Sequence, residues 1–390
     1  MNPVHNDICR TIDRYEETAV SISHRIHEHP ELKFEETFAA GLLVEAARGL
    51  GISAEAGAGG LKTAFRGEFG RPDGPTIAIL AEYDALPNGH SCGHNLIACA
   101  ALAAVAGLSG AADKVPGRIV FVGTPGEEMG GGKIILLDHG AFAGVDAAMM
   151  AHPLDAESCV SPTLAAKALQ FTFTGKAAHA AAAPWNGASA LAAVLQTFQS
   201  VDAARLHFRD GSRVHGIITN GGQAVNIIPE RAECQFVARA RGERDAEEMT
   251  SRIIKCAEAA ALATGTKAAH QRLIAYKNVI NNRAMALRYA AHSQELGTPA
   301  PEAGEAVSTA STDMGNVSHA IPSIHPVFQI SDSGQGTCHE DVFAKYTDAP
   351  RAYSAMIRVA KSLAMTAYDL LAEPELLKAA KIEFEQSHEH

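Results

Sequence analysis

The spacing of hydrophobic positions in the first third of the chain alternates between a helical period and short apolar runs. The helical period covers three segments, residues 6–28, 36–50 and 92–108. The apolar runs, which are typical of strands, cover residues 61–66, 76–81, 118–123 and 145–150. This alternation predicts a largely parallel sheet that is covered by helices.

The middle third of the chain follows a different order of elements. Strands are predicted at residues 168–174, 214–219, 231–240 and 267–276, and helices at residues 187–204 and 245–264. We expect Asp245 to cap the second of these helices and Gly265 to end it. The resulting β-α-β-β-α-β order predicts a ferredoxin-like unit with one layer of helices on one sheet.

From residue 282 onward the alternation of helix and strand resumes. Helices are predicted at 282–296 and 342–371, a strand at 324–330, and fraying of the charged residues 374–390. We therefore expect an α/β protein of two domains. Residues 1–166 and 278–390 would form a domain with a mostly parallel sheet, and residues 167–277 a satellite domain inserted into it, with hinges near residues 166 and 278.

Composition excludes several classes of function. The net charge of −11 argues against a surface for nucleic acids or anionic membranes, and no apolar run approaches the roughly 20 residues of a membrane span. The seven cysteines are odd in number and have no paired spacing, and the first ten residues lack the basic start and apolar core of a secretory leader. We therefore expect a cytoplasmic protein that binds neither nucleic acid nor membrane.

One short segment concentrates reactive side chains. Residues 82–95, E-Y-D-A-L-P-N-G-H-S-C-G-H-N, hold two carboxylates, one thiol and two imidazoles. These groups are typical metal ligands. The segment follows a predicted buried strand and precedes a predicted helix, and open α/β sheets carry their ligands at the carboxyl ends of strands.

Three other segments place similar groups at the ends of predicted elements. T-P-G-E-E supplies Glu127 and Glu128, A-H-P supplies His152, and G-T-C-H-E supplies His339. Of two adjacent carboxylates, one can bind a metal while the other takes a proton. Five candidate ligands exceed the needs of one tetrahedral ion, and they suit two ions that share a ligand and keep open positions. The five are Cys92, His94, Glu128, His152 and His339.

Each of these residues also has a structural explanation when it is taken alone. Cys92 could be a small buried residue at a helix start, His152 could cap a strand, and Glu127 with Glu128 could form a solvated turn. Their joint placement at element ends favours the metal site. The run Gly130–Lys133 lacks the spacing of a phosphate-binding loop, and we interpret it as a flexible turn that enters a helix.

Several motifs, in this order, resemble those of the M20 metallopeptidases. They are E-Y-D-A-L-P…C-G-H-N, T-P-G-E-E…G-G-G-K, A-M-M-A-H-P, G-K-A-A-H-A…P-W-N-G, V-H-G-I-I…N-I-I-P and S-T-D-M-G-N-V-S. The resemblance is strongest to the amidohydrolase branch that contains aminoacylase-1-like-2 proteins, aminobenzoyl-glutamate hydrolase subunits and hydrolases of hippurate and auxin conjugates. It runs from H-E-H-P-E-L, residues 27–32, to the region of His339.

The resemblance implies roles for individual residues. Cys92 would bridge two metal ions, His94 and His152 would bind one ion, and Glu128 and His339 would bind the other. The remaining roles fall to Glu127 as general base, Asp84 as the carboxylate that orients a ligand, His179 as an oxyanion donor that reaches a neighbouring subunit's site, and Asn226 as a substrate contact. Glu82 and His90 lose their status as ligands under this assignment.

Some positions stay ambiguous at this stage. Asn95 stands where the family often has Asp, and we do not count it as a ligand. His339 follows an unusual G-T-C, which makes His325 its competitor. Arg239 and Arg241 could either bind a substrate carboxylate or lie at the solvated end of a strand. Trp185 could pack in a core or a dimer contact, or it could stack on a ligand. A polar segment could form a turn or contact the substrate, and it consists of Ser311, Thr312, Asp313 and Asn316.

Together these observations predict a metal-dependent amidohydrolase. It would cleave the amide bond of an N-acyl or N-aroyl amino acid or a small dipeptide with a metal-activated water and a Glu base. Two divalent ions per subunit are implied, with Zn²⁺ or Mn²⁺ preferred and Co²⁺ or Ni²⁺ possible. We expect a homodimer formed through the satellite domain. The rival hypotheses are hydrolytic deamination of an aryl amine at the same site and a non-catalytic binding homologue.

Overall fold

The computed structural model describes residues 2–302 and 310–387, which form two compact units. The larger unit comprises residues 2–162, 279–302 and 313–387, and the smaller unit comprises residues 163–278 with 310–312. Each has its own hydrophobic core. The smaller unit is therefore an insertion in the chain of the larger one.

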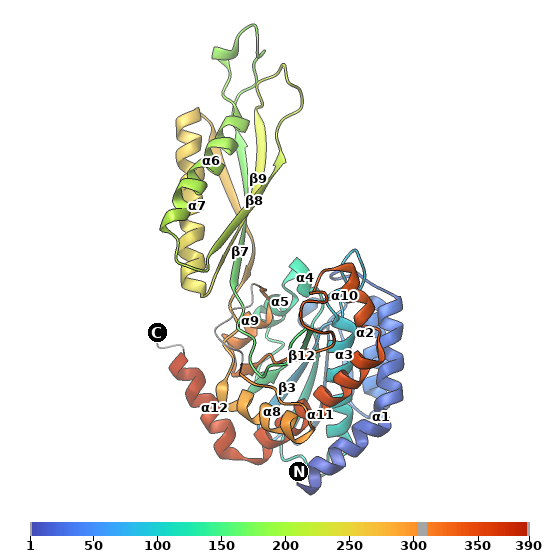
Figure 1. The fold of residues 1–390 in the computed structure, drawn as a ribbon. Coiled ribbons are helices and arrows are strands. Elements are labelled where there is room, and N and C mark those ends of the chain that lie inside the picture. Colours follow the sequence, from blue (N-terminus) through green and yellow to red (C-terminus); the bar gives the residue numbers. More distant parts are fainter. Residues whose placement is uncertain (1, 303–309, 388–390) are drawn as a thin grey trace. The chain divides into compact units, whose positions relative to one another are not determined.

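A six-stranded mixed sheet forms the centre of the larger unit (Figure 1). Its order is β1 (Ser53–Ala56), β2 (Phe65–Gly70), β4 (Arg118–Gly123), β3 (Thr76–Ala81), β5 (Ala147–Met149) and β11 (Ser323–Ile324). The strands from β4 to β11 are parallel, whereas β1 and β2 are antiparallel additions at one edge. The expected mostly parallel sheet is thus confirmed. The expected strand at 61–66 was wrong in position, since β2 begins only at Phe65.

The predicted strand at 324–330 proves to be two short strands. β11 pairs with β5 in the main sheet, and β12 (Val327–Gln329) pairs with β6 (His152–Leu154) in a second, two-stranded sheet. The turn between them contains His325 and Pro326, and the lack of a proline N–H interrupts regular pairing there.

Helices cover the main sheet. They are α1 (Pro3–Glu28), α2 (Thr37–Gly49), α3 (His94–Ser109), α4 (Glu127–Gly130), α5 (Gly132–Asp138), α8 (Arg283–Glu295), α9 (Met314–Ser318), α10 (Asp341–Tyr346), α11 (Pro350–Ala372) and α12 (Pro374–Ser387). All residues of α3 except the last are buried, and its apolar surface packs against α1 and α11. Gly107 permits this packing, because a Cβ there would lie 2.6 Å from a side-chain carbon of Ile12.

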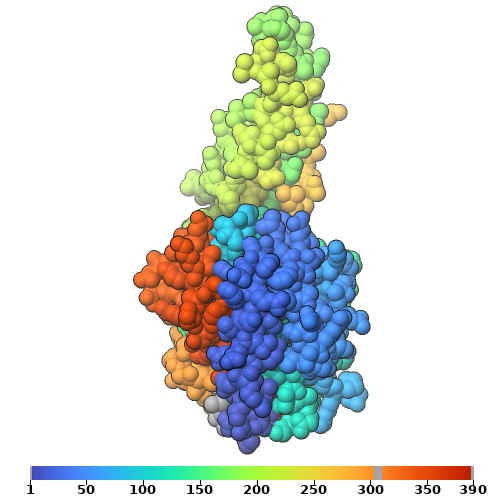
Figure 2. Space-filling model, turned by 90° about the vertical axis from the view of Figure 1, so that its right-hand side faces the viewer, coloured from blue at the N-terminus to red at the C-terminus, as the bar shows by residue number. Residues whose placement is uncertain are grey.

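Segments from both ends of the chain lie side by side on the surface of the larger unit (Figure 2). The long helical region expected at 342–371 consists of two helices, because Pro350 starts a new helix, α11, after a break at residues 347–349. The fraying expected from residue 374 is also wrong as far as Ser387, since α12 buries Leu377 and Ala380. Residues 388–390 lie outside the described part of the chain.

The smaller unit has the predicted β-α-β-β-α-β order. Its elements are β7 (Ala165–Thr174), α6 (Ala190–Ala204), β8 (Arg213–Asn220), β9 (Arg231–Ala240), α7 (Glu243–Thr264) and β10 (Lys267–Tyr276), and the sheet order is β10-β7-β9-β8 with all pairs antiparallel. Gly265 ends α7 at φ 65°, as expected. The N-cap is Gly242 instead of Asp245, which lies in the first turn, where its charge suits the helix dipole.

Two observations limit what the surfaces can do. The Trp185 side chain is 79% exposed, so its expected place in a core is wrong, and the alternative of a dimer contact stays a prediction. Among the described residues, no helix combines the length and the apolar character that crossing a membrane requires.

Candidate metal centre

The predicted ligands lie in the larger unit, where neighbouring parallel strands end together. Strands β4, β3 and β5 are adjacent, and their carboxyl ends lead to Glu127 and Glu128, to the segment 82–93, and to His152. This edge is the usual ligand site of an open α/β sheet. The arrangement therefore follows from strand order, as the sequence predicted.

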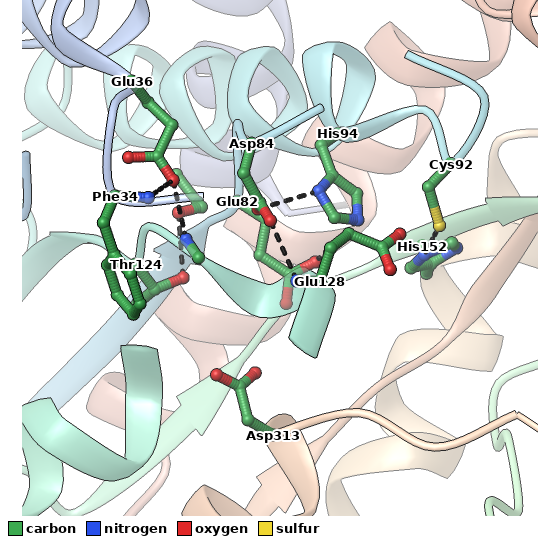
Figure 3. A network of polar contacts seen from close by, with 12 residues as sticks. Phe34, Glu36, Glu82, Asp84, Cys92, His94, Thr124, Glu128, His152 and Asp313 are labelled. Carbon is green, nitrogen blue, oxygen red and sulfur yellow. Dashed lines mark hydrogen bonds and ion pairs between the residues drawn. The ribbon is translucent and has the colours of Figure 1, made fainter. Parts of the chain in front are cut away.

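Asp84 links two of the candidate ligands (Figure 3). Its Oδ1 lies 3.0 Å from Nδ1 of His94, and its Oδ2 accepts a 2.9 Å hydrogen bond from the backbone N–H of Glu128. Both the Asp84 and the His94 side chains are fully buried. Burial disfavours the charged form of His94, but the carboxylates of Asp84, Glu82 and Glu128 outweigh it and raise the pKa of His94 well above its usual range. A metal ion at Nε2 would replace the proton there while Nδ1 goes on donating to Asp84.

The remaining candidate ligands lie around Nε2 of His94. The Sγ atom of Cys92 is 3.5 Å from Nε2 of His152, and one ligand atom each of Cys92, His94 and Glu128 lie within 4.8 Å of one another. His339 Nε2 is 3.0 Å from Oε1 of Glu128. The structure therefore brings together all five predicted ligands.

The C-terminal ligand is held against the segment after β3 by backbone contacts. The N–H of His339 donates to the carbonyl of Ser91 at 2.8 Å, and the Asn88 side chain donates to the carbonyl of His339 at 3.1 Å. His339 has φ 77°, a left-handed conformation that is uncommon for a residue with a side chain. These bonds place a residue from near the C-terminus beside Cys92.

The pKa shifts and the buried negative charges in this cluster favour the binding of cations. Burial, together with the charges of Glu82 and Glu128, raises the pKa of Glu127 well above its usual range. Burial also lowers the pKa of His152 to about 4, so this imidazole is neutral at pH 7 and can act as a ligand. Like-charged buried carboxylates are costly without a cation between them.

The donor set fits divalent metal ions. Nε2 of His94 and Oε2 of Glu82 are buried atoms without a hydrogen-bond partner in the described part of the structure. Buried polar atoms without partners cost about 1–3 kcal/mol each. Thiolate, imidazole and carboxylate groups around such atoms suit zinc and related ions better than magnesium or calcium.

The sequence did not reveal the buried ion pairs that Lys133 forms with Glu82 and Asp313. Lys133 is completely buried, and its Nζ donates to Oε1 of Glu82 and, at 2.8 Å, to Oδ1 of Asp313. The expected turn at Gly130–Lys133 does lead into a helix, α5, but the burial of Lys133 contradicts a flexible segment. Asp313 lies in a turn before α9, as expected, and its carboxylate is buried against Lys133. The one available signal was a lysine directly before the apolar run I-I-L-L.

The alternatives to these ligands can be compared directly. His325, the competitor of His339, is buried with its ring centre 5.8 Å from that of His152, whereas His339 is the histidine that contacts Glu128. Asn95 donates to the hydroxyl of Ser23 and to the carbonyl of Thr347, so its role is structural. The sequence did not suggest Cys338 as a candidate ligand. In the structure its thiol lies within 4.8 Å of the ligand atoms of Cys92 and His152.

The smaller unit contains the other predicted site residues. Nδ1 of His179 accepts hydrogen bonds from the N–H groups of Ala181 and Ala182 at 3.3 and 3.2 Å. The segment of Asn226 lies alongside, because the carbonyl of Asn226 accepts from the N–H of Ala180 at 2.9 Å. Arg239 on β9 donates to the hydroxyl of Ser311 at 3.0 Å. The substrate roles of His179, Asn226 and Arg239 stay predictions.

Comparisons with known proteins agree with this picture. A model of the peptidase dimerisation domain matches residues 165–264. The chain is 38% identical over 393 residues to the Xaa-Arg dipeptidase of Mus musculus, and the match covers 96% of this chain and 90% of that protein. It is 35% identical over 288 residues to one of the subunits of the p-aminobenzoyl-glutamate hydrolase of Escherichia coli, with 68% of this chain and 60% of that protein covered.

A solved structure shows the same fold. It is a dinuclear metal-binding peptidase of the M20 family from Bacillus subtilis, with a TM-score of 0.71 and 20% identity. The match covers 92% of this chain and 99% of the other. Both units of the fold therefore have counterparts in one known protein.

Proposed function

The chain belongs to the M20 family of peptidases and amidohydrolases, which are hydrolases acting on C–N bonds, and we propose that it cleaves small dipeptides or N-acyl and N-aroyl amino acids. Dipeptides that end in arginine are the first candidates, because the mouse and human relatives are Xaa-Arg dipeptidases. The observation that carries the proposal is the buried cluster of thiol, imidazoles and paired carboxylates at the ends of β3, β4 and β5.

We assign the ligands as the resemblance implies. Cys92 would bridge two ions, His94 and His152 would hold one, and Glu128 and His339 would hold the other. The 3.5 Å approach of Cys92 to His152 and the 3.0 Å approach of His339 to Glu128 support these pairings. Two divalent ions at such a site would polarise the amide carbonyl and increase the acidity of a water molecule.

The chain's own groups would manage the proton and the developing charge. The raised pKa of Glu127 suits a base that accepts a proton from water and then gives it to the leaving amine. Asp84 would keep His94 and the backbone of Glu128 in place through its two hydrogen bonds. His179 would donate from Nε2 to the carbonyl oxygen as it becomes negative.

We also propose that the protein forms a homodimer through its smaller unit. This unit is a peptidase dimerisation domain. Its edge strand β8 exposes Ile217 and Ile218, and an open edge with apolar side chains is a natural pairing surface.

A hydrolysis screen tests the reaction. The metal-free protein is reloaded with Zn²⁺, Mn²⁺, Co²⁺ or Ni²⁺ in turn and offered Xaa-Arg and Xaa-Lys dipeptides, N-acyl amino acids, aminobenzoyl-glutamate and aryl amines. We expect release of an amino acid with at least one metal, and the largest kcat/KM for the Xaa-Arg dipeptides. Ammonia release from an aryl amine alone would support the deaminase instead. Inactivity on every compound would support the non-catalytic homologue.

Asp84→Asn is expected to weaken metal binding about 10–100-fold. Asp84 accepts two N–H groups, one from His94 and one from Glu128, and an amide can accept only on its oxygen. In the variant, the NH₂ group of the new amide would point at one of these two N–H donors. The repulsion would displace either His94 or Glu128. Isothermal titration of the metal-free variant with Zn²⁺ measures the loss.

Glu36→Gln is the matched control for this variant. Glu36 is also a buried carboxylate, and its Oε1 accepts from the N–H groups of Phe34 and Gly126 while its Oε2 accepts from the Thr63 hydroxyl. A glutamine satisfies all three, because the hydroxyl can rotate to accept from the amide. We expect this variant to bind metal as the wild type does. Equal affinities for both variants would contradict the role of Asp84.

A further inference from the structure

Glu82 has one carboxylate oxygen that takes no part in the proposed mechanism. The residue directly follows β3 and is completely buried. Its Oε1 accepts from Nζ of Lys133, whereas its Oε2 has no hydrogen-bond partner in the described part of the structure. Oε2 lies 3.7 Å from Nε2 of His94. A buried, unpartnered carboxylate oxygen beside an imidazole nitrogen is the arrangement expected where the two groups share a cation.

The direction of this carboxylate is fixed from behind. Lys133 is held by Asp313 at two points, since its Nζ donates to Oδ1 at 2.8 Å and its backbone N–H donates to Oδ2 at 2.9 Å. All three side chains are at most 1% exposed. Because Nζ of Lys133 donates to Oε1 of Glu82, the other carboxylate oxygen, Oε2, faces the imidazole of His94. Lys133 also supplies a positive charge that offsets part of the cost of burying two carboxylates.

Both nearby histidines present Nε2 to the same point. Nδ1 of His94 faces the carboxylate of Asp84 at 3.0 Å, and Nδ1 of His152 faces the carbonyl of Pro153 at 2.8 Å. In each ring Nδ1 is therefore used, and Nε2 is the atom left to bind a cation in place of a proton. The ligand atoms of Glu82, His94 and His152 lie within 4.8 Å of one another. Two histidines and one glutamate are a known ligand set for catalytic zinc.

We propose that Glu82 is a further protein ligand of the ion assigned to His94 and His152, with Lys133 and Asp313 as its positioning residues. The proposal reverses the expectation that Glu82 is not a ligand, and it rests on the proposed dinuclear centre. It explains why Oε2 of Glu82 and Nε2 of His94 are both buried without hydrogen-bond partners.

Metal content tests the proposal without relying on activity. Wild type and Glu82→Gln are dialysed against a competing chelator, and zinc is then counted by mass spectrometry. We expect two ions per wild-type subunit, and in the variant an affinity for one of them that is at least about 10-fold weaker. The visible spectrum of Co²⁺-loaded protein should change in the same variant, because one oxygen donor is lost.

Two more variants separate ligand loss from misfolding. Glu82→Gln leaves Lys133 paired with Asp313 alone, whereas the double variant Glu82→Gln with Lys133→Met also removes the lysine charge and leaves the buried Asp313 carboxylate without its cation. We expect Glu82→Gln to melt close to the wild-type temperature in the metal-free state, because the Lys133–Asp313 pair persists, and the double variant to melt lower. Both variants should still bind one ion weakly. Lys167→Met is the control, because this buried lysine pairs with Glu243 and Glu247 of its own, smaller unit.

The outcomes distinguish the two proposals. A wild type that binds no ion would overturn the dinuclear centre itself. A wild type with two ions, together with a folded Glu82→Gln variant of equal affinity and equal Co²⁺ spectrum, would overturn the role of Glu82 alone. Lys133→Met by itself should weaken the same ion by a smaller factor than Glu82→Gln, and an unchanged affinity would remove Lys133 and Asp313 from the proposal.

Discussion

Glu127→Gln is expected to lower kcat by about 10²–10⁴-fold while the variant keeps its metal. An amide of the same size cannot accept and return a proton, yet it fills the same space. Glu127 is the first residue of α4, directly before the proposed ligand Glu128. The loss should therefore appear in turnover and leave metal content unchanged.

The surroundings of Glu127 explain why this residue, and not its neighbour, is assigned the proton. Burial raises its pKa first, and the charges of Glu82 and Glu128 raise it further. Glu128 has a lowered pKa, because contacts with His339 and His94 outweigh its burial. The two adjacent carboxylates therefore have pKa values that are shifted in opposite directions. A pair of this kind indicates which carboxylate carries the proton and which stays ionised. The group that takes protons more readily is the better base near neutral pH.

Steady-state kinetics and zinc counting on the same preparation measure this effect. Glu157→Gln is a suitable control, because Glu157 is a mostly buried carboxylate of the same unit that bonds to Gln329 and Arg358 and belongs to no metal-ligand cluster of the described residues. We expect this control to turn over like the wild type. Normal turnover by Glu127→Gln would contradict the assignment of Glu127 as the general base. Loss of metal from this variant would indicate that Glu127 is a metal ligand instead.

Much of the site could be predicted because its parts lie at the ends of regular elements. The apolar runs of β3 and β4 are easily recognised, and parallel neighbours end on the same edge of a sheet. Cys92, Glu128 and His152 could therefore be expected to meet on the strength of the sequence alone. The approach of His339 follows from no such rule, because its contact with Glu128 spans more than two hundred residues. The sequence offered it only as a histidine at the start of a predicted helix, and the resemblance to a family supported that choice.

The rest depended on contacts that leave no periodic signal. Lys133 and Asp313 are 180 residues apart, and both are polar residues in segments that resemble ordinary turns. Burial of an ion pair depends on the tertiary environment, which hydrophobic spacing does not report. The same limit applies to β1, whose sequence S-A-E-A has a single buried residue and no strong strand pattern. Tertiary pairing with β2, not local preference, forms that strand.

His179→Ala is expected to lower kcat by about 10²–10³-fold without loss of metal. Nδ1 of His179 accepts from two backbone N–H groups, which fixes the proton on Nε2 and makes that atom a hydrogen-bond donor. A bridge to Ile227 holds the backbone of His179 in place. His270→Ala, which removes another exposed histidine of the smaller unit, is the control. Equal activity of all three proteins would exclude the proposed oxyanion role.

Mixing two inactive variants decides whether His179 serves its own subunit or its partner. Homodimers of Glu127→Gln and of His179→Ala should both be nearly inactive. In a mixed dimer, action across the interface gives one site both an intact Glu127 and an intact His179, so about half of the wild-type activity per mixed dimer should return. Action within one subunit leaves a defect in each site, and mixing then restores nothing. Differently tagged subunits, refolded together and purified on both tags, supply the mixed dimer, and failure to isolate it would contradict the homodimer itself.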